Sequence, residues 1–253
     1  MMLSQNLSLH LESPLPTNRI AILSQEEAFR SGADARLAVM VSGPEVLLTQ
    51  ARSFAEDFSK IKHEALLGVT DGKAVGTYIE TAFKLRLLED GVIQEDEGNA
   101  ARGIDLPSLN TDIKVTSTRQ PQSSSPFASF RQKIEGLGYD LILFVYDKLD
   151  EAGECSVEFR AVRRIPARLT GDFTTTQGLR RLILDEHGNA DDVFAFLAEK
   201  NIPADESSLY EYAQWLLENP PEQGHLTISN ALQWRLQYGR VVAGGIVGID
   251  EII

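Results

Sequence analysis

The sequence predicts an α/β protein in which helices flank a central mixed β-sheet, with additional helical elements. Three segments carry this prediction. Apolar residues recur at helical spacing over 73–88, apolar and polar residues alternate over 111–117, and the run 139–146 is almost wholly apolar. The first pattern is typical of an amphipathic helix, the second of a half-buried strand, and the third of a strand covered on both faces. We expect the helix to lie with its apolar face against the sheet.

The flanking segments add further elements. Between residues 35 and 67, apolar positions repeat every three to four residues around Gly43-Pro44, which indicates two helices. By the same kind of pattern we expect a hairpin over 103–117, a helix at 127–137, a strand at 156–165, two short helices after Ala190, and a packed final strand or oligomer contact at 241–253.

A chain of 253 residues can bury a substantial core and still carry an appended region. We divide it into an N-terminal helical region (1–70), a core (71–185) and a C-terminal accessory region (186–253) that packs on the core.

The composition is that of a folded protein in a reducing compartment. Apolar residues make up 43% and charged residues 24%, which excludes global disorder. The first residues lack the basic start and apolar run of a signal peptide, and no later stretch reaches membrane-spanning length. Cys155 has no second cysteine with which to form a disulfide. We therefore expect a cytoplasmic protein without a membrane partner.

The net charge of −13 opposes nucleic-acid binding, which depends on cations that neutralise phosphates. The charge is uneven, however, because acidic residues gather at 89–97 while a group of arginines lies in a later segment. The members of this group are Arg160, Arg163, Arg164, Arg168, Arg180 and Arg181. Their clustering favours a local positive face.

One constellation carries chemistry: Asp105, Asp112 and Lys114. Carboxylates are ligands for the hard cation Mg²⁺, and a nearby lysine can steady a phosphate or help to deprotonate a water. On a strand, Asp112 and Lys114 project from one face, and a hairpin can bring Asp105 alongside. Ile113 and Val115 would bury the opposite face. This set suits the hydrolysis of a phosphodiester bond.

A second match to the short pattern provides a comparison within the chain. Asp71-Gly72-Lys73, with Asp57 upstream, has the same spacing but falls on a turn between two helices. Its carboxylate and amine are not held on one strand face, so we reject it.

The order of these elements resembles the PD-(D/E)XK core shared by type II restriction endonucleases. The resemblance covers 73–148, and the Lys73…Gly76…Glu80 spacing is similar to that of the branch that contains the methyl-directed mismatch-repair endonuclease. It departs from the family pattern in having Ile104 where the name calls for proline.

This resemblance implies a restriction-endonuclease-like fold with 71–185 as its catalytic core. It also implies that Asp105 and Asp112 bind Mg²⁺, that Lys114 is the catalytic lysine and that Glu80 is an auxiliary acidic ligand. The expected activity is Mg²⁺-dependent cleavage of double-stranded DNA at a specific sequence, by a homodimer that matches a palindromic site.

Polar side chains near this centre are candidates for DNA contact, because amides and guanidinium groups can pair with base edges or phosphates. They are Arg119, Gln120, Gln122 and Ser124 in the loop after the catalytic strand, Gln132 and Lys133 on the next helix, and Arg163 and Arg164. Two other hypotheses about the function remain open. A catalytically silent DNA-binding or assembly module would tolerate loss of Asp112, and an acidic protein-interaction module would not bind duplex DNA at low salt.

Overall fold

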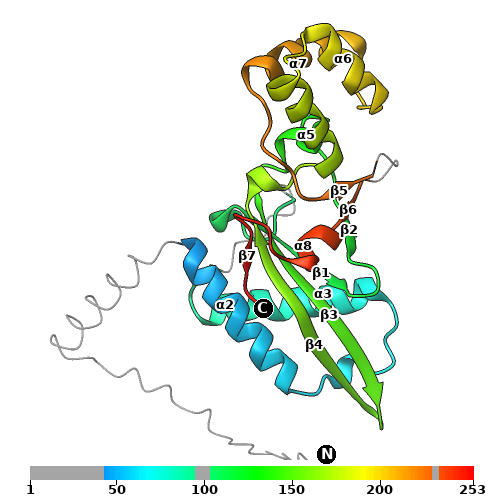
Figure 1. The fold of residues 1–253 in the computed structure, drawn as a ribbon. Helices are drawn as coiled ribbons and strands as arrows, with labels where there is room; N and C mark the ends of the chain where they lie inside the picture. The colour runs from blue at the N-terminus through cyan, green and yellow to red at the C-terminus, as the bar shows by residue number, and fades with distance from the viewer. Residues whose placement is uncertain (1–42, 95–102, 230–233) are drawn as a thin grey trace, which may run out of the picture. The chain divides into compact units, whose positions relative to one another are not determined.

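The computed structural model describes residues 43–94, 103–229 and 234–253. Its main sheet has the strand order β1-β3-β4-β7 (Figure 1). The strands are β1 (Thr111–Ser117), β3 (Asp140–Glu151), β4 (Glu154–Ile165) and β7 (Asp250–Glu251). β1 runs parallel to β3, whereas the pairs β3–β4 and β4–β7 are antiparallel. The predicted α/β fold with a mixed central sheet flanked by helices is therefore confirmed.

Helices α2 (Gly43–Lys60) and α3 (Gly72–Glu89) pack on one face of this sheet. Phe54, Phe83 and Phe144 meet there, with ring centroids 5.0–5.7 Å apart. The helix predicted at 73–88 is confirmed as α3, where the side chain of Asp71 caps the first turn. Of the two helices expected over 35–67, α2 is confirmed and is followed by a single 3₁₀ turn, η1 (Glu64–Leu66), while residues 35–42 lie outside the described ranges.

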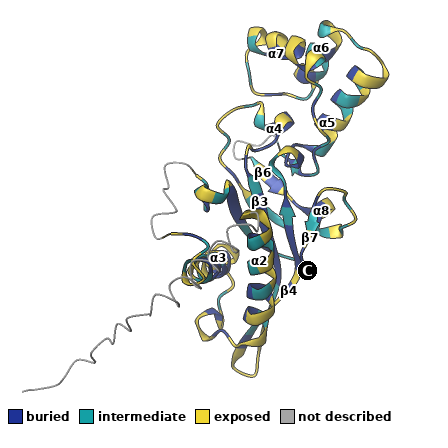
Figure 2. Cartoon of the chain, turned by 90° about the vertical axis from the view of Figure 1, so that its left-hand side faces the viewer, coloured by how far each residue is buried: buried dark blue, intermediate teal, exposed yellow. Residues whose placement is uncertain are grey.

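The opposite face of the sheet is covered by a second, three-stranded sheet of order β2-β6-β5 and by α8. These elements are β2 (Gln122–Ser124), β5 (Thr227–Ile228), β6 (Arg235–Gln237) and α8 (Gly239–Ala243). Successive side chains of β3 therefore pack on alternate sides, with Phe144 toward α2 and α3 and Leu143 toward this second sheet. Both faces of β3 are buried, as its continuous apolar run predicts (Figure 2).

A third apolar cluster forms between helical segments that lie within residues 132–218. It joins α4 (Gln132–Glu135), α5 (Phe173–Arg180), η4 (Arg181–Asp185), α6 (Ala190–Glu199) and α7 (Glu206–Glu218). The two short helices predicted after Ala190 are confirmed. A 3₁₀ turn, η3 (Ala167–Leu169), connects β4 to this part of the chain.

Two predicted elements are wrong in extent. The hairpin over 103–117 is a single antiparallel bridge between Leu106 and Thr111, because Pro107 opens a 3₁₀ turn, η2 (Pro107–Leu109), instead of continuing a strand. The helix expected at 127–137 contains only the four residues of α4. Phe127 instead packs on Trp234, with ring centroids 4.0 Å apart.

The apolar tail ends as a packed strand, because β7 joins the edge of β4 and Ile252 is buried. Among the described helices, none combines the length and the apolar character needed to cross a membrane.

The junction between the two sheets and the helical cluster depends on a close crossing of Gly171 and Gly224. A Cβ atom on Gly224 would lie 2.2 Å from the carbonyl oxygen of Gly171. We therefore expect Gly224→Ala to lower the free energy of unfolding by about 1–3 kcal/mol. Gly239→Ala is the matched control, since nothing lies within 4 Å of its Cβ position. Urea unfolding measures both variants, and equal midpoints would contradict the prediction.

Candidate active site

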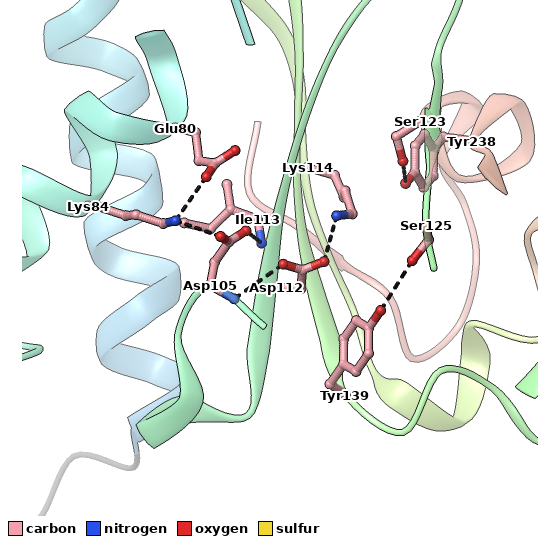
Figure 3. A network of polar contacts seen from close by, with 10 residues as sticks. All are labelled: Glu80, Lys84, Asp105, Asp112, Ile113, Lys114, Ser123, Ser125, Tyr139 and Tyr238. Atoms are coloured by element: carbon pink, nitrogen blue, oxygen red, sulfur yellow. Dashed lines mark hydrogen bonds and ion pairs between the residues drawn. The ribbon is translucent and has the colours of Figure 1, made fainter. Parts of the chain in front are cut away.

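The chemical residues gather on β1, an edge strand of the main sheet (Figure 3). Ile113 points into the core beneath α2 and α3, which turns Asp112 and Lys114 to the other side of the strand. Lys114 Nζ lies 2.6 Å from Asp112 Oδ2. The structure therefore brings this pair together on one face, but not fully outward, because Asp112 is only 4% exposed and Lys114 17%.

Asp105 reaches the same place through the turn rather than through a strand. The bridge between Leu106 and Thr111 folds the preceding residues back over β1. Asp105 Oδ2 accepts a hydrogen bond from the main-chain amide of Ile113 at 3.0 Å, and its own amide donates to Asp112 Oδ1 at 3.3 Å. The two carboxyl groups are thus held next to each other by main-chain contacts.

Glu80 approaches this pair from α3, but it does so through a residue that the sequence patterns did not single out. Lys84 Nζ lies 2.8 Å from Glu80 Oε1 and 2.5 Å from Asp105 Oδ1. Glu80 and Lys84 are one helical turn apart, a spacing common to solvated ion pairs on helices. The available signal was the stripe of polar residues on α3 that also includes Lys73 and Thr77.

Crowding of the acids changes their protonation. Burial, together with the neighbouring Asp105, raises the pKa of Asp112 to about 7, although Lys114 opposes the shift. Burial acts in the same direction on Asp105, but hydrogen bonds with Asp112, Lys84 and the Ile113 amide outweigh it and lower the pKa of Asp105. Ionisation of Asp105 therefore disfavours ionisation of Asp112, and the pair of carboxyl groups retains one proton up to near neutral pH.

The donor set fits a magnesium ion bound by two carboxylates. Asp112 Oδ2 is buried and accepts no hydrogen bond, and its polar contact is the ion pair with Lys114. Mg²⁺ characteristically takes one or two carboxylates and completes its shell with water and phosphate oxygens. Within the described residues, no group of three or more histidine, cysteine or acidic side chains is arranged to hold a metal. The two carboxylates of Asp105 and Asp112 suit the ion, and Lys84 contacts Asp105 Oδ1 as well as Glu80 Oε1.

A groove of about 870 Å³ opens beside this centre and is lined by both sheets and by α3. Glu80 and Lys114 line it together with three predicted DNA-contact residues, Gln120, Gln122 and Ser124. The groove also contains Arg235, an exposed residue that β6 places opposite Ser124 of β2. Sequence patterns could not identify Arg235, because its partner Ser124 lies more than a hundred positions earlier in the chain.

The loop that contributes these polar side chains is fixed by hydroxyl groups. The hydroxyl of Thr116 lies 3.0 Å from the carbonyl oxygen of Gln120 and accepts a hydrogen bond from the amide of Gln122 at 3.1 Å. Ser123 Oγ pairs with the hydroxyl of Tyr238 at 2.5 Å, and Ser125 Oγ pairs with that of Tyr139 at 3.3 Å (Figure 3). The loop is therefore anchored to the strand that carries Lys114.

The other predicted DNA-contact residues lie elsewhere. Arg119 is exposed and lines a separate cavity that also contains Arg160. Gln132 donates to the carbonyl of Leu137 and accepts from the amide of Ala128. Lys133 is buried, and burial lowers its pKa.

Arg163 and Arg164 have internal partners. Arg163 is buried and donates to the carbonyl of Ile253, and Arg164 forms ion pairs with Asp140 and Asp250. These contacts tie the C-terminal strand to β4 and engage the guanidinium groups of Arg163 and Arg164 within the protein. The DNA contacts expected of Arg163 and Arg164 stay predictions.

Asp112 and Lys114 on the edge strand of a helix-flanked mixed sheet, with Asp105 beside them, form the arrangement expected of a PD-(D/E)XK nuclease. The family model described as type II restriction enzyme NspV matches residues 43–251. The type II restriction enzyme NspV of Nostoc sp. (strain ATCC 29411 / PCC 7524) is 52% identical over 200 residues, which cover 78% of this chain and 90% of that protein. No solved structure matches the chain. The chain therefore belongs to the NspV family of type II restriction enzymes.

The raised pKa of Asp112 predicts a pH dependence of stability in EDTA. The folded chain keeps a proton on Asp112 between its ordinary pKa of 3.8 and about 7, whereas the unfolded chain has released it. The free energy of unfolding should therefore fall as the pH rises from about 5 to about 8, by on the order of 3 kcal/mol. Asp112→Asn stays neutral, so its profile should be flatter. Urea unfolding at each pH measures both profiles, and parallel curves would argue against the assignment.

Proposed function

We propose that this protein is a Mg²⁺-dependent type II restriction endonuclease that hydrolyses phosphodiester bonds of double-stranded DNA at a specific sequence. Membership of the NspV family supports the class of reaction. The observation that carries the proposal for this chain is the contact of Asp105, Asp112 and Lys114 at the side of a polar groove.

The residues have separate roles in this reaction. Asp105 and Asp112 would hold Mg²⁺, which supplies Lewis-acid stabilisation of the charge that builds on the phosphate. Lys114 is positioned by Asp112 and donates to a phosphate oxygen or orients the attacking water. Glu80 is an auxiliary acid whose position depends on Lys84.

In the hydrolysis, the oxygen of a water forms a bond to phosphorus while the bond from phosphorus to the 3′ oxygen breaks. One water proton leaves toward the acidic pair or solvent, and the leaving oxygen gains a proton. The products are a 5′-phosphate and a 3′-hydroxyl, as the family resemblance implies. The centre lies beside the groove, so a strand in the groove would present its phosphate to Lys114.

We assign recognition of the DNA sequence to the groove wall opposite α3. Gln120, Gln122 and Ser124 offer donors and acceptors that suit base edges, and Arg235 adds a guanidinium that suits guanine or a phosphate. These local contacts operate against the overall net charge of −13, which the bound cation offsets only at the cutting site.

We also propose a homodimer in the cytoplasm. A two-fold protein matches a palindromic DNA site, with each copy cutting one strand. Both statements rest on the class of enzyme and on the sequence.

Cleavage tests the proposal directly. Purified protein with mixed plasmid DNA and Mg²⁺ should give discrete fragments, and EDTA should abolish them. Lys114→Ala should slow cleavage by about 10²–10³-fold, because it removes a donor that acts on the charged transition state. Lys60→Ala, which removes an exposed lysine paired with Asp57 on α2, should cut normally. Intact DNA with the wild-type protein would favour a catalytically silent module, and unchanged cutting by Asp112→Ala would exclude Asp112 from the catalytic centre.

Binding tests the assigned groove wall. Arg235→Ala should weaken binding to a cleavable duplex by about 10–100-fold, equivalent to the loss of about 1–3 kcal/mol for a base or phosphate contact. The control is Arg86→Ala, which removes an arginine paired with Asp90 outside the groove. Fluorescence anisotropy with Ca²⁺ in place of Mg²⁺ reports affinity, and equal affinities for the two variants would exclude Arg235 from the interface.

A further inference from the structure

The ammonium group of Lys84 lies between two acids of the candidate active site. It is 2.8 Å from Glu80 Oε1 and 2.5 Å from Asp105 Oδ1, and all three side chains are between 21% and 31% exposed (Figure 3). A partly buried lysine that contacts two carboxylates at once is more than a solvated helix pair, because both contacts are screened less than on an open surface.

Contacts outside this ion-pair network hold Glu80, Lys84 and Asp105 in place. Ile79, Phe83 and Leu87 are fully buried on the inner side of α3, which sets the rotation of the helix and directs Glu80 and Lys84 toward β1. Asp105 is fixed independently by the amide of Ile113. The ion pairs therefore connect two elements whose positions are already determined by other contacts.

Charges in the centre favour a single divalent cation. Glu80, Asp105 and Asp112 bring three carboxylates, while Lys84 and Lys114 bring two ammonium groups, so the formal sum of these five side chains is one negative charge. One divalent ion turns this sum into one positive charge. A second divalent ion would add two more beside two lysines in a partly buried site, which electrostatics opposes.

A two-metal site commonly needs a carboxylate between ions about 3.5–4 Å apart. Asp105 is the carboxylate that could take this position between Asp112 and Glu80, but its Oδ1 is already paired with the Lys84 ammonium. We propose that Lys84 is a positioning residue that acts as a fixed cation in place of a second metal, so that each centre binds one divalent ion at Asp105 and Asp112. This inference rests on the proposed function, since it assumes that those aspartates bind metal.

The test counts Mn²⁺ ions on the full-length, metal-free protein at pH 8 without DNA. Electron paramagnetic resonance measures free Mn²⁺ during titration, and the spectrum of the bound ions shows whether two of them lie close enough to couple. The wild type and Lys84→Arg should bind one ion per chain with an uncoupled spectrum. Lys84→Met should bind two ions per chain with a coupled spectrum, because Glu80 and Asp105 are then released to a second ion.

Matched variants separate this effect from a loss of folding or of general charge. Lys60→Met removes a lysine that pairs with Asp57 at the surface, and it should keep the wild-type count of one. Lys84→Gln should behave as Lys84→Met does, and thermal unfolding identifies which variants are folded.

The possible failures are distinguishable. A wild type that binds two coupled ions, or a folded Lys84→Met and Lys84→Gln pair that still binds one, overturns the role of Lys84 while the metal site stands. A wild type that binds no Mn²⁺ overturns both the inference and the metal site in the proposed function.

Discussion

The hydrogen bond from the Ile113 amide to the Asp105 carboxylate is the contact on which the centre depends. β1 pairs with β3 on one side and forms the edge of the main sheet, so amides on its other side need partners from outside the strand. Asp105 supplies such a partner. The same bond that protects the sheet edge also sets one acid beside Asp112, and a single contact thus serves both the fold and the chemistry.

This arrangement places like charges close together in a poorly solvated position. The two aspartates adjoin each other and are relieved by lysines from two directions, Lys114 on the strand and Lys84 on the helix. The cores on the two faces of β3 supply the rigidity that holds these groups against their repulsion, through the phenylalanines below α2 and α3 and through the second sheet. Such local instability in a rigid frame is expected where a protein prepares a site for a cation.

Local patterns predicted the part of the fold that local forces determine. The helical spacing of α3, the alternation of β1 and the apolar run of β3 each follow from which faces are buried, and the pairing of Asp112 with Lys114 follows from the strand period. The predicted hairpin placed Asp105 correctly beside Asp112. The hairpin itself is reduced to one bridge, however, because Pro107 begins a 3₁₀ turn.

Contacts between distant segments could not be predicted in this way. β2 pairs with β6 more than a hundred residues later in the chain, so local patterns could not place Arg235 near the site. Lys84 could not be singled out because it resembles any helix lysine four residues after a glutamate. The partners of Arg164 were equally hidden from local patterns, because its guanidinium pairs with Asp140 and Asp250 and so joins the tail to the sheet.

The attachment of the groove loop to Thr116 has an evolutionary consequence. The hydroxyl of Thr116 engages only main-chain atoms of Gln120 and Gln122, so it makes no demand on which side chains the loop displays. Relatives could exchange those side chains, and with them the preferred base sequence, while the hydrolytic residues on the same strand stay in register. Target choice and bond breaking are adjacent in space yet separable by mutation.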